Sequence, residues 1–85
     1  MYNIVFTKQA AKTLQRIPYD VTGLIREKLD EIANDPFASH PNTTKLQGRP
    51  GYRLRIGDWR IIYEVQKVEL MIIVLKIARR DEAYR

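Results

Sequence analysis

Residues 51–65 read GYRLRIGDWRIIYEV, two runs of alternating side chains on either side of Gly57-Asp58. Alternation with a period of two is typical of strands, and a two-residue connection containing glycine is typical of a β-hairpin turn. The stretch therefore predicts an antiparallel hairpin that turns at this pair. Its predicted register sets Ile56 opposite Trp59, Arg55 opposite Arg60 and Leu54 opposite Ile61.

The two faces of this hairpin differ in chemistry, because opposite residues and residues two apart share a face. One face is apolar and is predicted to pack in the core: Tyr52, Leu54, Ile56, Trp59, Ile61, Tyr63 and Val65. The other face carries Arg53, Arg55 and Arg60. Like charges set opposite each other cost about 0.2–1 kcal/mol per pair, so we expect a bound polyanion to offset that cost.

The composition indicates one small globular domain spanning residues 1–85, with 45% apolar and 29% charged residues. No apolar run reaches the roughly 18 residues of a membrane span, and the N-terminus lacks a secretory pattern, so we expect a cytoplasmic protein without a membrane partner. The absence of cysteine excludes a disulfide framework. With a single histidine as well, we expect no zinc or other metal site and no cofactor.

The positive charge is concentrated in the second half of the chain. Residues 1–48 hold six Lys/Arg against five Asp/Glu, whereas residues 49–85 hold nine against five. Seven of those nine are arginines, whose planar guanidinium suits phosphate. The asymmetry indicates nucleic acid or an acidic protein as the partner.

The remaining elements are predicted from periodicity and from helix boundaries. Residues 2–6 indicate a first strand, and Thr7 can cap a helix that ends at Ile17, before proline. A second helix follows from Pro18 to Asp35, residues 35–50 are predicted to be irregular, and residues 70–77 form an interior strand. In that last strand we expect Lys76 on the arginine side, because a lysine under the helices would be costly to bury.

This order, β-α-α-β-β-β, predicts an α+β fold with a mainly antiparallel sheet. The helical hairpin must cover the apolar face, since nothing else in the chain can. The arginine face is then expected to remain an open, shallow surface.

With these elements in place, the chain resembles the RelE/ParE superfamily of toxins from type II toxin–antitoxin modules. The resemblance extends over nearly the whole chain. It includes the helical hairpin that ends in Asp-Pro, the segment KLQG at residues 45–48 and the core YRLRIGDWRIIYEV. It also includes RRDEAY at residues 79–84, and the most specific spacing is that of Arg55, Gly57, Arg60 and Tyr63.

The resemblance is closest to the RelE-type members and implies a ribosome-dependent endoribonuclease that cuts messenger RNA in the ribosomal A site. By position, the implied catalytic set is Arg53, Arg55, Arg60, Arg80 and Tyr84. Further candidates to contact the RNA are Lys45, Arg49, Lys76 and Arg79. The first two catalytic positions are lysines in the best-known relative, and arginine is a far poorer proton acceptor. The general base is therefore not assigned.

The same side chains make chemical sense without the family. Arg60 and Arg80 could clamp phosphate oxygens and bind more strongly as charge develops, while Tyr84 could stack on a base or assist proton transfer. A conventional acid–base pair is missing from the predicted face. Such a site should be poor on free RNA and should depend on the ribosome to position its substrate.

Two alternatives stay open. A ParE-type relative would inhibit DNA gyrase and cleave no RNA, and an inactive relative would only bind its antitoxin. The implied partners are a cognate antitoxin, the ribosome and messenger RNA. Assembly into a larger complex is expected only through the antitoxin, which we expect to be partly disordered and to fold on binding.

Overall fold

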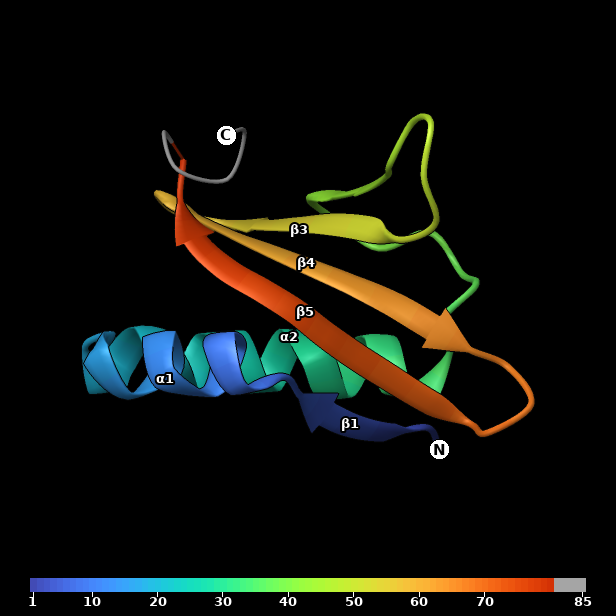
Figure 1. Cartoon of the computed structure of the whole chain (residues 1–85), viewed down its shortest axis with the longest axis horizontal. Coiled ribbons are helices and arrows are strands. Elements are labelled where there is room, and N and C mark those ends of the chain that lie inside the picture. Colours follow the sequence, from blue (N-terminus) through green and yellow to red (C-terminus); the bar gives the residue numbers. More distant parts are fainter. Residues whose placement is uncertain (81–85) are drawn as a thin grey trace.

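Two helices cover one face of a five-stranded sheet in the computed structural model of this chain, which describes residues 1–80 (Figure 1). The elements in order are β1 (Asn3–Phe6), α1 (Lys8–Arg16), α2 (Tyr19–Asn34), β2 (Thr43–Lys45), β3 (Tyr52–Ile56), β4 (Trp59–Gln66) and β5 (Met71–Arg79). The predicted α+β architecture is confirmed. The short strand β2 is an addition, because residues 35–50 were predicted to be irregular.

The strand order is β1-β5-β4-β3-β2. β1 pairs with β5 in parallel, and the other three pairings are antiparallel. The sheet is therefore mixed but mainly antiparallel, as predicted. β5 lies between the first strand of the chain and β4 (Figure 1).

The hairpin of β3 and β4 has the predicted register. Leu54 lies opposite Ile61, Arg55 opposite Arg60 and Ile56 opposite Trp59. Gly57 begins the two-residue turn with φ +56°. A positive φ at the first turn residue is what a type II′ hairpin turn requires, and glycine adopts it without strain.

A β-bulge interrupts the pairing of β4 with β5. Ile62 lies opposite Lys76, whereas the next residue, Tyr63, lies opposite Val74, so Leu75 is the extra residue. The Thr7 hydroxyl at the start of α1 donates a hydrogen bond of 2.8 Å to the Leu75 carbonyl oxygen. The bulge changes which residues of β5 face inward, and it leaves Lys76 on the arginine side, as predicted.

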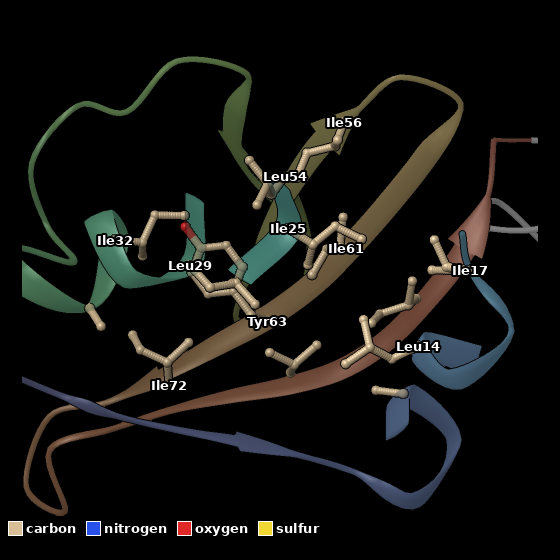
Figure 2. Packing of buried hydrophobic residues seen from close by; sticks show 14 residues of the cluster. Leu14, Ile17, Ile25, Leu29, Ile32, Leu54, Ile56, Ile61, Tyr63 and Ile72 are labelled. Atoms are coloured by element: carbon tan, nitrogen blue, oxygen red, sulfur yellow. The ribbon is translucent and has the colours of Figure 1, made fainter. Parts of the chain in front are cut away.

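The core lies between the helices and the inner face of the sheet. Thr7 caps α1, accepting a hydrogen bond from the Ala10 N–H, and the chain turns into α2 at Ile17 and Pro18. Figure 2 shows residues of the sheet packed against residues of α2. The largest fully buried side chains are Ile25, Leu29 and Ile32 from α2 and Leu54, Ile61, Tyr63, Ile72, Val74 and Ile77 from the sheet. Tyr52, Trp59 and Val65 pack at its margin, so the predicted packing role of the hairpin aromatics is confirmed.

None of the helices within residues 1–80 combines the length and apolar character that crossing a membrane would require.

Candidate functional site

The open face of the sheet holds a cleft of about 420 Å³ close to the turn between β3 and β4. Within residues 1–80, six polar side chains line it: Asn42, Thr44, Arg53, Arg55, Arg60 and Arg80. The volume is within the range of roughly 300–1,000 Å³ that small-ligand sites occupy. Four of the lining residues are arginines, and none of the six carries a negative charge, so the cleft is built to bind an anion.

Arg60 forms the most constrained part of this cleft. Its side chain is only 5% exposed, and it is the one buried charged residue within residues 1–80. Its Nη1 donates hydrogen bonds of 3.1 Å to the carbonyl oxygens of Gly57 and Trp59. These contacts fix the guanidinium against the turn before any ligand arrives.

No carboxylate of residues 1–80 forms an ion pair with Arg60. A buried charge without an opposite charge is costly, and Arg55 directly across the strand pair adds like-charge repulsion. An anion bound in the cleft would offset both terms. The burial cost of Arg60 and its repulsion with Arg55 therefore both favour binding of a negatively charged ligand.

Arg53, Arg55 and Arg80 line the same cleft as Arg60. Arg53 and Arg55 come from β3, where Arg53 is half-buried and Arg55 is exposed. Arg80 follows β5, and its backbone N–H donates a hydrogen bond of 2.8 Å to the Asp58 carbonyl oxygen. That bond ties the end of β5 to the turn, which brings a residue twenty positions away in sequence beside Arg60.

The structure does not gather all the predicted RNA-contacting residues. Lys45 lies opposite Tyr52 in the pairing of β2 with β3, so it belongs to the helix-covered side of the sheet. Arg49 is exposed in the loop before β3. Neither residue lines the cleft.

Two further predicted contacts lie on β5. Lys76 shares the open face with the arginines but does not line the cleft. Arg79 lies opposite Trp59, with its guanidinium carbon 5.7 Å from the centre of the indole ring, which directs it to the other face. Tyr84 lies outside the described residues.

Asn42 and Thr44 are cleft residues that the sequence analysis missed. Thr44 lies opposite Arg53 in β2, and Asn42 comes just before that strand. The signal was present in the sequence as two β-branched threonines, which favour strands. A three-residue strand is too short for its alternation to stand out.

Among the titratable groups of residues 1–80, Tyr63 has a clearly shifted pKa, and it lies on the core side. Burial of the phenol, with Tyr52 stacked 5.3 Å away, raises the pKa of Tyr63 to about 12. Thr43 lies near enough to lower this pKa slightly, but it does not form a hydrogen bond with the buried hydroxyl. Tyr63 therefore remains a neutral phenol and packs in the core, away from the cleft.

The charged side chains that line the cleft are all guanidiniums. Guanidiniums donate hydrogen bonds and carry charge, but they do not accept protons near neutral pH. The described cleft can therefore hold phosphate and stabilise charge that develops on it. It contains no histidine or carboxylate among its lining residues to move a proton.

Solved structures share this fold. A chain of the archaeal RelE–RelB complex from Pyrococcus horikoshii OT3 is 30% identical over 95% of this chain and 97% of its own length, with a TM-score of 0.81. The isolated RelE toxin of Escherichia coli is 25% identical over 99% of this chain and 92% of its own, also with a TM-score of 0.81. The protein is therefore a RelE-like α+β protein, and its open face carries a cleft lined by four arginines.

The family follows from sequence. The family model described as "ParE toxin of type II toxin-antitoxin system, parDE" matches residues 4–84. The toxin RelE of Mycobacterium tuberculosis strain H37Rv is 29% identical over 99% of this chain and 87% of its own length. The chain belongs to the ParE toxin family of type II toxin–antitoxin systems, as its resemblance to the RelE/ParE superfamily predicted.

Proposed function

We propose that this toxin is a ribosome-dependent endoribonuclease that cleaves messenger RNA in the ribosomal A site and so arrests translation. The observation that carries the proposal is the buried guanidinium of Arg60, which forms no ion pair with a carboxylate of residues 1–80, at a cleft lined by three further arginines. A gyrase-directed toxin would have no need for such a constrained phosphate site.

The reaction that suits the cleft is cleavage of RNA by its own 2′-hydroxyl. The 2′-oxygen bonds to phosphorus as it loses its proton, the bond from phosphorus to the 5′-oxygen breaks, and the leaving oxygen takes up a proton. The products are a 2′,3′-cyclic phosphate and a 5′-hydroxyl end. Arg60 and Arg80 would neutralise the charge that builds on the phosphorane, and Arg53 and Arg55 would hold neighbouring phosphate oxygens.

The dependence on the ribosome follows from what the lining residues cannot do. With no efficient proton acceptor among them, the enzyme gains most from an RNA that is already held with its 2′-oxygen in line for attack. The ribosome would supply that geometry. The toxin would then act in the cytoplasm, where translation takes place.

A cognate antitoxin is the proposed protein partner. Structures similar to this chain include toxin–antitoxin complexes from Pyrococcus horikoshii and Escherichia coli. A partly disordered segment with acidic residues would complement the arginine cleft and would become ordered as it binds. Any larger assembly is proposed to form through the antitoxin.

Arg60→Ala tests the proposal. Purified variant and native chain are added to ribosomes programmed with a defined message, and cut sites are mapped by primer extension. Removing one transition-state donor of this kind costs about 10²–10³-fold in rate. Arg16→Ala, at the exposed end of α1, serves as the matched control and should cut normally.

Arg60 also anchors the turn, so the fold of Arg60→Ala must be checked by circular dichroism. Arg55→Ala, at an exposed position, provides a second variant that leaves the turn contacts intact. Full cleavage by a folded Arg60→Ala variant would overturn the proposal.

The gyrase-inhibitor alternative is favoured by one observation, the parDE description of the matching family model. A brief induction of the toxin without antitoxin separates the two. Protein synthesis should fall first for a ribonuclease, and DNA synthesis first for a gyrase inhibitor. If neither falls, the chain is an antitoxin-binding module without toxicity of its own.

A further inference from the structure

One wall of the cleft is neutral, and it is formed by residues from the segment 42–44, which contributes no arginine to the cleft. Asn42 and Thr44 line this wall, next to the guanidiniums of β3. Thr44 lies opposite Arg53 on the open face. The Asn42 carbonyl oxygen accepts a hydrogen bond of 2.9 Å from the Arg55 backbone N–H, which fixes the position of Asn42 relative to β3.

The backbone of Asn42 is also unusual. Its φ is +61°, in the left-handed region that side chains other than asparagine and aspartate rarely adopt. Asparagine at this position thus combines a tolerated backbone with an amide at the cleft. The hydrogen bond from Arg55 and the backbone conformation together fix the backbone position from which this amide extends.

The neutral wall offers hydrogen bonding that the arginines cannot. A guanidinium only donates, whereas the asparagine amide and the threonine hydroxyl both donate and accept. Phosphate oxygens only accept, so arginines are sufficient for them. The edges of nucleobases present donors as well as acceptors. Adenine, for example, has an N7 acceptor beside an N6 donor, and only a group that both donates and accepts can pair with the two together.

Resting on the ribonuclease function proposed above, we infer that Asn42 and Thr44 read the base of the nucleotide held in the cleft and set the sequence preference of cleavage. The arginines hold the phosphate, and the neutral wall selects the base. An asparagine amide forms two hydrogen bonds with adenine, so adenine-containing sites depend most on Asn42.

The first test compares cut-site distributions on ribosomes carrying a mixed library of messages. The variants are Asn42→Gly, which keeps the positive φ, and Thr44→Val, which keeps the shape. Each should reduce cleavage at the preferred sites by about fivefold relative to other sites. An unchanged distribution, whether total cleavage is kept or uniformly lowered, overturns the inference.

Matched controls lie close by in the chain. Thr43→Val removes a hydroxyl from the same strand but from its other face, opposite Leu54. Asn34→Ala removes an exposed amide at the end of α2. Both controls should keep the native distribution.

A second test does not depend on cleavage. Nuclear magnetic resonance follows the Asn42 side-chain amide of the full chain while adenosine 5′-monophosphate or ribose 5-phosphate is added. The inference expects a shift with the nucleotide and little or none with ribose 5-phosphate, which has the sugar and phosphate but no base. Equal shifts, or none with either, overturn it. If the native chain cuts no RNA, the proposed function fails and this titration still decides base recognition.

Discussion

The two faces of the sheet are made from alternate residues of the same strands, yet they are stabilised in different ways. On the helix-covered face, apolar side chains such as Leu54 and Ile61 are fully buried against partners from α2 (Figure 2). On the open face, Arg55 and Arg60 repel each other, and Arg60 is buried without a carboxylate partner from residues 1–80. One face stabilises the fold, and the other keeps an unfavourable arrangement that a ligand can relieve. A period of two lets both properties be encoded in one hairpin.

The largest effect is expected on the helix-covered face. Ile61→Ala removes a side chain with 0% exposure and leaves a cavity, so the free energy of unfolding should fall by about 2–5 kcal/mol. Urea denaturation measures this loss. Any reduction in RNA cleavage should then follow the folded fraction. A loss of cleavage in fully folded protein would contradict the separation of the two faces.

The second effect concerns Tyr63 at alkaline pH. Its pKa is raised to about 12 in the folded chain, whereas the unfolded chain ionises near the ordinary value of 10. The stabilising effect of the neutral phenol is therefore complete below pH 10 and is lost as the pH rises through 12. The expected loss is on the order of 2 kcal/mol.

Tyr63→Phe is the control for that prediction, because it removes the ionising group and a buried hydroxyl without a hydrogen-bond partner. Its stability near neutral pH should equal or exceed that of the native chain. Between pH 10 and 12 the difference between the two proteins should grow in favour of the variant. Parallel curves would show that Tyr63 does not titrate as described.

The smallest effect is expected for Arg55→Ala on the open face. Relief of repulsion with Arg60 should leave the free energy of unfolding unchanged or raise it by up to about 1 kcal/mol. Binding of single-stranded RNA should weaken, and the slope of log K against log salt concentration should fall by about 0.7. A clear loss of stability would mean that this arginine supports the fold.

The sequence was sufficient for features that depend on local pattern. The register of the β3–β4 hairpin follows from alternation and from the turn at Gly57, and this register places Arg53, Arg55 and Arg60 on one face. Lys76 was placed correctly by the cost of burying an ammonium.

Other features depend on contacts between distant segments. The parallel pairing of β1 with β5 and the bulge at Leu75 involve Thr7, 68 positions away, and no local pattern encodes them. For the same reason the neutral cleft wall was missed, since Thr44 enters the site only through its pairing with β3.

The position of β5 in the sheet has a consequence for folding during synthesis of the chain. A ribosome makes β5 after every other element of residues 1–80, yet both β1 and β4 must pair with it. Until then β1 has no neighbouring strand, and the main-chain bond from Arg80 to Asp58 that completes the cleft cannot form. The complete sheet therefore cannot form until β5 has been made, and the arginine cleft is assembled only after this last strand.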